Sequence, residues 1–184
     1  MKKIILSISI LLSGIAFGQS NSIDYTDSLE TYTFIDEVLI SELVFTLINE
    51  ERVKAGLNKL EKYTPLYNIA QEHAEWISET SISEHSSHIK ATNMGPEFHR
   101  RYNYAENMIC QKTIQNFTHI RKARGYVAIW MNSPGHRANI LDPNNKYIGV
   151  GFSRKDKLNT LDSPKEQNCV VTFTEYKCKP YPAK

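Results

Sequence analysis

One segment constrains the fold of this chain more than any other: residues 130–141, with the sequence WMNSPGHRANIL. A long helical pattern ends at Asn132, and Pro134-Gly135 then forces a turn. A second, short helix is predicted from His136 to Leu141, stopped by Asp142-Pro143. His136 therefore starts a helix, where its ring can point into a cleft. The helix dipole lowers the pKa of such a histidine, which keeps it neutral and able to bind a metal or accept a proton.

The remaining elements follow from hydrophobic periodicity and turn residues. Helices are predicted over Ile35–Ala55, Thr64–Ile77 and Thr118–Asn132. In the second of these, Thr64 is the predicted N-cap and Pro65 lies in the first turn. Strands are predicted over Ala105–Gln111, Tyr147–Phe152 and Cys169–Cys178. Ser81–Tyr104 reads as loop with a short helix after Pro96, and Arg154–Asn168 as a polar connector. Helices and hairpin-linked strands predict an α+β fold with a mainly antiparallel sheet, rather than a doubly wound parallel sheet.

The N-terminus has the three parts of a secretory signal peptide. Met1-Lys2-Lys3 is positive, Ile4–Phe17 is almost entirely apolar, and small residues precede a cleavage site after Gly18. The apolar run is too short to span a membrane, which takes roughly 20 residues. We therefore expect a protein exported to the periplasm or the cell exterior, with a signal peptide over residues 1–18, a lead-in over 19–37 and one domain over 38–184.

Charge argues against several partners. The formal charge of +2 becomes 0 when the two signal-peptide lysines are subtracted, and no basic run remains. The sequence thus gives no support for nucleic acid or an anionic membrane as partner. After cleavage 184 − 18 = 166 residues remain, which suits a single domain without a transmembrane segment. We expect a monomer.

The chain has three cysteines, Cys110, Cys169 and Cys178. If residues 169–178 form one strand, its ends lie about 30 Å apart, whereas the Cα atoms of a disulfide lie within about 7 Å. Cys169 and Cys178 should then not pair, and any disulfide would use Cys110. A redox motif or a cysteine zinc site is not expected, because the chain lacks a CxxC pair.

Several motifs together resemble the CAP superfamily of SCP-like extracellular domains, in its bacterial branch. Residues 130–141 resemble the WMNSPGHRANIL signature, and Ala105-Glu106-Asn107-Met108 resembles the GEN motif. Residues 47–52 (LINEER), 70–74 (AQEHA) and 148–151 (IGVG) resemble its first two helices and a later strand. The resemblance covers roughly residues 41–176. It implies an α-β-α sandwich with a large cleft on one face.

The resemblance also implies a cleft lined by two histidines and two glutamates. His136 matches the second histidine, Glu106 the first glutamate and His85 the first histidine, with His88 as a rival. The second glutamate has no match, because Ser133 stands at its place. Ala105 replaces the family glycine, which suggests that the backbone there does not require positive φ, or that the local turn differs. The candidate cleft residues are His85, Glu106, Asn107, Ser133 and His136.

Three kinds of chemistry are open to these residues. His85, Glu106 and His136 could hold Zn²⁺ with water in an open position. Glu106 could act as general base with His136 as acid, although the sequence offers no clear nucleophile. In the third interpretation the cleft is polar and its residues hydrogen-bond one another. His73 is predicted on the solvated or partly buried side of the second helix, and His119 at a basic helix entry.

The missing second carboxylate favours binding over catalysis. Our leading hypothesis is an exported binding module that holds a lipid, a cell-wall fragment or a peptide in its His/Glu cleft. The alternatives are a metal-dependent, peptidase-like hydrolase using His85, Glu106 and His136, and an adhesion or host-interaction protein acting through its outer surface.

Overall fold

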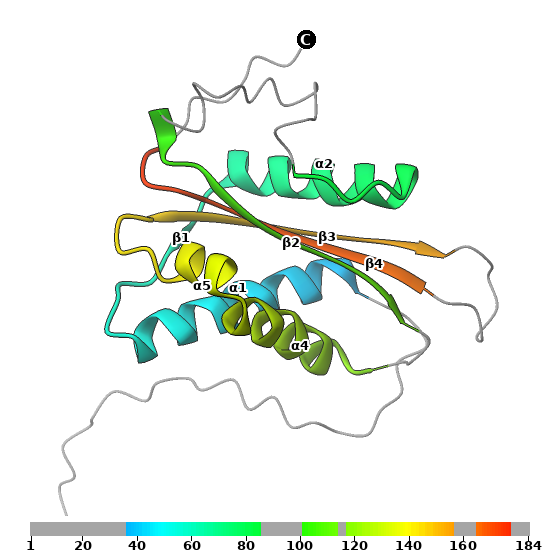
Figure 1. Ribbon diagram of the computed structural model, residues 1–184, viewed down its shortest axis with the longest axis horizontal. Coiled ribbons are helices and arrows are strands. Elements are labelled where there is room, and N and C mark those ends of the chain that lie inside the picture. Colours follow the sequence, from blue (N-terminus) through cyan, green and yellow to red (C-terminus); the bar gives the residue numbers. More distant parts are fainter. Residues whose placement is uncertain (1–35, 86–100, 114–116, 157–164, 178–184) are drawn as a thin grey trace, which may run out of the picture.

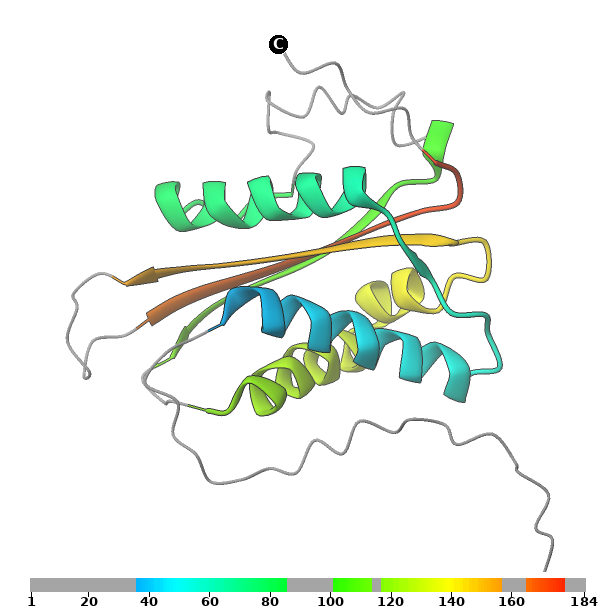
Figure 2. The same ribbon diagram turned by 180° about the vertical axis from the view of Figure 1, so that it is seen from behind.

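Residues 36–85, 101–113, 117–156 and 165–177 are described by the structure, a computed structural model. They form three layers, with helices on both faces of one four-stranded sheet (Figures 1 and 2). One face is covered by α2 (Thr64–Thr80) and the other by α1 (Glu37–Lys54), α4 (His119–Asn132) and α5 (Pro134–Ile140). The predicted α-β-α sandwich is confirmed.

The sheet has the strand order β1-β3-β4-β2 and is mainly antiparallel, as predicted. Its strands are β1 (Glu61–Lys62), β2 (Ala105–Thr113), β3 (Tyr147–Asp156) and β4 (Lys165–Thr174). β4 pairs antiparallel with both neighbours, so that Val171 lies between Val150 of β3 and Asn107 of β2. The two-residue β1 runs parallel to β3, and the sequence pattern does not predict it.

β3 and β4 are longer than their apolar residues predict. Asp156 pairs with Lys165, so both ends of the expected connector Arg154–Asn168 belong to strands. β4 ends at Thr174, so the predicted strand Cys169–Cys178 is wrong at both ends. Polar residues enter the ladder because they find partners there: the Tyr126 hydroxyl, for example, donates to Gln167 Oε1 over 2.7 Å. Strand ends are therefore set by pairing and not by hydrophobicity alone.

The two described cysteines are free and lie on opposite faces of the sheet. Cys169 is opposite Ile109 in the ladder and is buried in the core beneath α1 and α4. Cys110, one residue further along β2, packs in the cluster beneath α2. Side chains alternate between faces along a strand, so these two thiols cannot bridge. The predictions that involve Cys178 concern a residue outside the described part of the chain.

Helices α1 and α4 begin at side-chain caps. Asp36 accepts a hydrogen bond from the Leu39 N–H over 2.9 Å, and Thr118 accepts one from the Arg121 N–H over 3.3 Å. Each cap satisfies an N–H that the first helical turn leaves unpaired. Between these helices and the sheet lies the larger core, which includes Ile40, Val44, Ile48, Ala123, Trp130, Phe152, Val171 and Phe173.

Arg52 ties the end of α1 to the end of α5. Its side chain is only 1% exposed, and its guanidinium donates to backbone carbonyls of four residues: Asn58, Ile140, Asp142 and Asn145. The carbonyl groups at a helix C-terminus lack partners within the helix, and a buried guanidinium supplies them. Arg52 thereby fixes the short helix that carries His136.

On the other face α2 lies directly on the backbone of β3. A Cβ atom at Gly149 would come within 2.1 Å of the Leu66 carbonyl carbon, and one at Gly151 within 2.3 Å of that of Ala70. α2 begins one residue earlier than predicted: Thr64 is helical, and Tyr63 stands at the N-cap position without a side-chain cap. This close contact sets the height at which α2 holds its side chains above the sheet.

Several predictions concern residues outside the described ranges. They include the signal peptide over 1–18, the lead-in up to residue 35, and most of the short helix after Pro96, of which Arg101 and Tyr102 are described as helical. None of the helices in the described part of the chain is long and apolar enough to cross a membrane.

Candidate functional site

Glu106 is the centre of the site. It lies near the start of β2, an edge strand of the sheet, and its side chain is 4% exposed. Alternation along β2 puts Tyr104, Glu106 and Met108 on the same face, towards α2. A carboxylate so deeply buried needs hydrogen-bond donors around it, since burial without them costs several kcal/mol by order of magnitude.

Three side chains donate to this carboxylate. His85 Nδ1 lies 2.9 Å from Glu106 Oε1, while His73 Nδ1 and the Tyr104 hydroxyl lie 3.1 and 3.0 Å from Oε2. The donors come from α2, from the segment after α2 and from the residue before β2. The site is thus assembled across the boundary between the sheet and the α2 layer.

His73 links Glu106 to the segment that carries His85. Its side chain is fully buried, and its second ring nitrogen, Nε2, lies 2.8 Å from the backbone carbonyl oxygen of Glu84. Both ring nitrogens therefore face acceptors, and a neutral imidazole has only one N–H to donate. His73 therefore bridges the Glu106 carboxylate and the Glu84 carbonyl. The expectation that His73 lies on a solvated or partly buried side of the helix is wrong.

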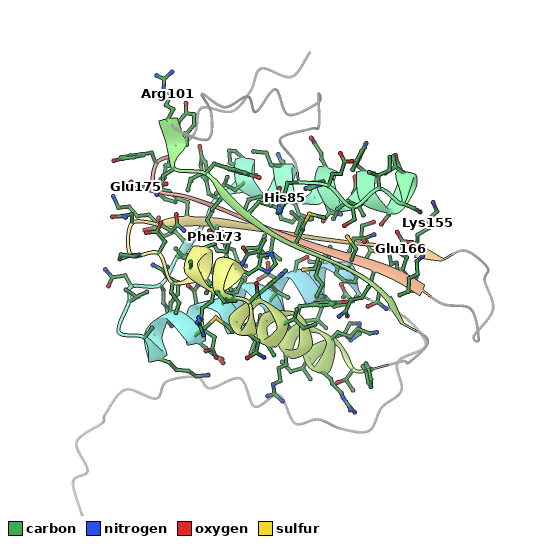
Figure 3. All side chains as sticks on the ribbon, viewed as in Figure 1. His85, Arg101, Lys155, Glu166, Phe173 and Glu175 are labelled. Carbon is green, nitrogen blue, oxygen red and sulfur yellow. The ribbon has the colours of Figure 1, made fainter. Side chains whose placement is uncertain are left out.

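His85 is the accessible member of the cluster. It directly precedes the undescribed residues 86–100, and its side chain is 57% exposed. Figure 3 labels it near α2. The hydrogen bond that His85 donates to Glu106 raises the pKa of His85, and burial partly opposes that shift. Its Nε2 has no hydrogen-bond partner among the described residues, so it is available to a ligand. His88, the rival candidate, is outside the described part of the chain.

His136 lies in the first turn of α5, half-buried. Its Nδ1 is buried and has no hydrogen-bond partner among the described residues. Burial lowers the pKa of His136, and repulsion from His85 lowers it further. The predicted direction of this shift is confirmed, but burial, rather than a helix dipole, is its main cause.

Asparagine side chains hold α5 against β2. Asn107 is fully buried, and its side-chain amide donates to the backbone carbonyl of His136 over 2.9 Å, so it holds the His136 backbone against β2. Asn139 donates to Asn107 Oδ1 over 2.8 Å, and Asn145 donates to the Asn139 carbonyl over 2.9 Å. Ser133 lies at the junction of α4 and α5, and within the described residues its hydroxyl makes no hydrogen bond to the cluster.

A zinc ion held jointly by His85, Glu106 and His136 does not fit this arrangement. Both Glu106 oxygens already accept bonds from side chains, and His85 spends Nδ1 on one of them. Over the described ranges no three His, Cys, Asp or Glu side chains are grouped as metal ligands. Of the three, His85 and Glu106 are joined by a hydrogen bond, whereas His136 Nδ1 has no hydrogen-bond partner among the described residues.

Sequence reasoning missed three contributors: His73, Tyr104 and Asn139. His73 follows Leu66 and Ala70 by seven and three residues, so helical periodicity places it on the buried face of α2. Tyr104 precedes Glu106 by two residues, which puts both on one face of the strand. No local signal marks Asn139, because its partner Asn107 is 32 residues away in the sequence.

The model of the cysteine-rich secretory protein (CAP) family matches residues 45–173. Two curated relatives come from Bacillus subtilis (strain 168). The uncharacterized protein YkwD is 34% identical over 113 residues, which is 59% of this chain and 40% of that protein. The uncharacterized membrane protein YlbC is 30% identical over 116 residues, 61% of this chain and 31% of that protein. The chain therefore matches well under half of each.

Solved structures show the same fold. An outer surface protein from Borrelia burgdorferi is 26% identical with a TM-score of 0.54, over 78% of this chain and 97% of that one. A cysteine-rich secretory protein from Staphylococcus aureus (17% identical, TM-score 0.51) is matched over 77% of this chain and 40% of that one. The family match spans α2, β2 and α5, the elements that build the site. This chain belongs to the CAP family of cysteine-rich secretory proteins.

Proposed function

We propose that this CAP domain is an exported binding module whose ligand contacts His85 and His136. The observation that carries the proposal is that the Glu106 carboxylate already accepts hydrogen bonds from His73, Tyr104 and His85. A carboxylate whose oxygens accept three side-chain bonds is poorly suited to take a proton from water. Glu106 then serves as an anchor that orients His85, and the groups left for a ligand are imidazole nitrogens.

The two histidines offer complementary groups to that ligand. The pKa of His85 is raised by Glu106, so over a wider pH range its exposed Nε2 carries a proton to donate. The pKa of His136 is lowered by burial, so its ring stays neutral. A hydrogen-bond acceptor such as a phosphate, carboxylate or carbonyl oxygen suits His85. Lipids, cell-wall fragments and peptides all carry one of these groups.

The proposal is tested by thermal denaturation with three probes: glycerol phosphate, muramyl dipeptide and an acetylated tripeptide. A ligand that binds the folded state raises the melting temperature in a concentration-dependent way. We expect one probe class to do so for the native chain, and His85→Ala and His136→Ala to abolish the effect. Ile129→Ala, a change at an exposed apolar residue of α4, is the matched control and should keep it.

Other outcomes separate the alternatives. The probe should be recovered unchanged by mass spectrometry; a cleaved probe would favour a hydrolase that uses Glu106 and His136. If none of the probes stabilises the protein and His136→Ala is indistinguishable from the native chain in every binding assay, the cleft proposal is wrong. A surface-acting adhesion protein would then be the better hypothesis.

Export is the second part of the proposal. It is supported by the charged, apolar and small-residue segments of residues 1–18 and by the similarity to an outer surface protein of Borrelia burgdorferi. Expression of the full chain in a bacterial host should yield exported protein that begins at Gln19. Cell-retained protein that still begins at Met1 would contradict export without affecting the binding proposal.

A further inference from the structure

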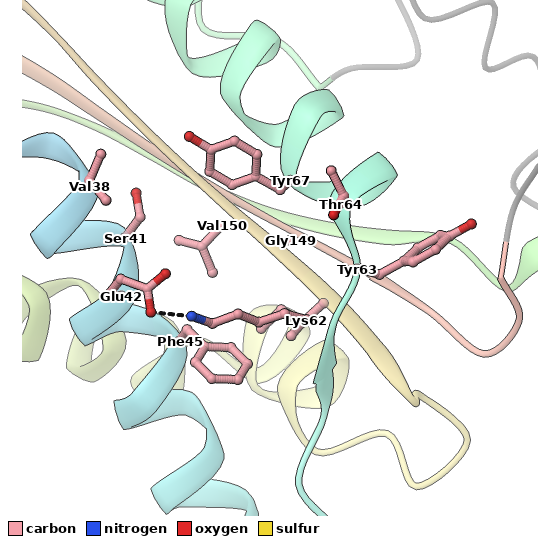
Figure 4. A pocket seen from close by; sticks show the side chains of 11 residues that line it. Val38, Ser41, Glu42, Phe45, Lys62, Tyr63, Thr64, Tyr67, Gly149 and Val150 are labelled. Carbon is pink, nitrogen blue, oxygen red and sulfur yellow. Dashed lines mark hydrogen bonds and ion pairs between the residues drawn. The ribbon is translucent and has the colours of Figure 1, made fainter. Parts of the chain in front are cut away.

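A cavity lies at the opposite edge of the sheet from Glu106. Its volume is about 190 Å³, and it is lined by α1, β1 with its connection into α2, the start of α2, and β3 (Figure 4). Aromatic and aliphatic side chains dominate its lining: Val38, Phe45, Tyr63, Tyr67, Ile148 and Val150. Val38 and Tyr67 are 66% and 41% exposed, so the apolar surface continues to the mouth.

The floor of this cavity is the outer edge of β3, and most of that edge is already paired. At one end the Tyr63 N–H donates to the Ile148 carbonyl over 3.0 Å. At the other end the Gln71 side-chain amide pairs with Phe152 in both directions, donating to its carbonyl and accepting from its N–H, each over 3.1 Å. The Gln71 side chain thus makes the two hydrogen bonds to Phe152 that a neighbouring strand would make.

Val150 lies midway between these two paired residues. Peptide groups two residues apart in a strand point to the same side, so the N–H and C=O of Val150 face outward between Tyr63 and Gln71. Across the described residues neither group has a hydrogen-bond partner, although Val150 is only 5% exposed. A buried peptide group without a protein partner is uncommon and calls for a ligand or water.

We infer that this cavity is a second binding site, which takes a short extended peptide by strand addition to Val150. A peptide unit supplies the donor and the acceptor that Val150 needs, as the Gln71 amide does for Phe152. An apolar side chain of the peptide would occupy the space between Phe45 and Tyr67. At the rim Glu42 and Lys62 pair with each other, which leaves the mouth without net charge and favours an uncharged segment (Figure 4). This site is independent of the His85 and His136 cleft.

The probe is acetyl-Ala-Phe-Ala-amide, added to the isotope-labelled full chain and followed by NMR. We expect the Val150 amide signal to shift and its hydrogen exchange to slow as peptide is added. The matched peptide carries an N-methyl group on the phenylalanine nitrogen and should bind at least about fivefold more weakly, because it has lost one hydrogen bond.

Two exposed valines on α1 provide matched protein variants. Val38→Trp should obstruct the mouth and weaken binding at least about fivefold, whereas Val53→Trp, at the far end of the helix, should leave it within about twofold.

The inference is overturned if the Val150 amide is already protected from exchange in the free protein. It is also overturned if the N-methyl peptide binds equally well, or if the peptide shifts only His85 and His136. The ring signals of those histidines report separately on the cleft, so either site can fail alone.

Discussion

His73 Nδ1 lies 3.1 Å from Glu106 Oε2, and both side chains are buried between α2 and the sheet. The same imidazole reaches the Glu84 carbonyl, next to His85. One buried residue therefore connects the carboxylate at the centre of the site with the segment that presents its accessible histidine. In this chain Glu106 is held by side chains and is not exposed to bulk water.

Replacing His73 by Phe should cost about 3 kcal/mol of folding free energy, because Glu106 is left buried beside an apolar ring. Denaturant unfolding measures the loss. Tyr104→Phe removes one neutral donor to the same carboxylate and should cost about 1 kcal/mol. If His73→Phe is no worse than Tyr104→Phe, the contact between His73 and Glu106 does not stabilise the buried carboxylate as described.

The His85 and His136 rings should titrate on opposite sides of pH 6.5, their common reference value. NMR titration of the ring protons checks this order. Glu106→Gln removes the charge that raises the pKa of His85 and should bring its midpoint back towards the reference. Equal midpoints for the two rings in the native chain would contradict the arrangement described.

The pKa shifts of His85 and His136 also determine whether the stability of the fold rises or falls with pH. His85, with a raised pKa, stabilises the fold fully below about pH 6.5 and loses this contribution as pH rises through its folded pKa. Because His85 is more than half exposed, the effect should stay below about 1 kcal/mol. His136, with a lowered pKa, acts in the opposite sense: its neutral ring is favoured, and stability falls as the pH drops below 6.5. Melting temperatures of His85→Ala and His136→Ala across pH 5 to 8 separate the two contributions.

Arg52→Ala should destabilise the protein by about 3 kcal/mol or more, since it removes donors from buried carbonyl groups of four residues. Lys54→Ala is the control on the same helix. Its ammonium is 67% exposed and pairs with Glu51, so the change should cost less than about 0.5 kcal/mol. Urea unfolding compares the two, and similar losses would refute the role given to Arg52.

Glycine substitutions probe the contact between α2 and β3. Gly149→Ala places a Cβ within 2.1 to 2.4 Å of the Leu66 and Tyr67 backbone, so it should cost more than about 3 kcal/mol or prevent folding. Gly125→Ala, inside α4 with no atom within 4 Å of the new Cβ, should stabilise by about 0.5 to 1 kcal/mol. Circular dichroism during thermal unfolding distinguishes a gain from a loss, and a tolerated Gly149→Ala would contradict this contact.

Cysteine labelling tests the alternation of faces in β2 and β4. Cys169 is fully buried, which raises the pKa of its thiol strongly, so it should resist iodoacetamide in the native state. Cys110 is half-buried and should react faster, although burial raises its pKa as well. Peptide mapping without reductant should show no Cys110–Cys169 link. The separate prediction that Cys169 and Cys178 do not pair is checked in the same map.

The sequence predicted the features of the fold that depend on interactions between residues close together in the chain. The break after Asn132 was predicted, although Pro134 and Gly135 begin α5 and only Ser133 lies between the two helices. The periodicity of residues 35–55 likewise predicted α1, although Val38 and Leu39 of its apolar stripe are exposed. The resemblance to the CAP superfamily added the sandwich and the pair Glu106 and His136, which long-range contacts then bring towards His85.

Tertiary structure decided everything that depends on distant partners. Arg154 and Gln167 lie in the predicted polar connector, yet both belong to strands, because they pair in the ladder and the Tyr126 hydroxyl donates to Gln167. The sequence predicts His73 on the solvated or partly buried side of its helix, yet it is fully buried and pairs with Glu106, 33 residues away in the sequence. A buried polar group is stable only where the folded chain supplies its partners. The sequence and its family resemblance therefore indicated Glu106, His136 and His85, and folding decided that Glu106 accepts hydrogen bonds from three side chains, of which His73 and Tyr104 were not predicted as members of the site.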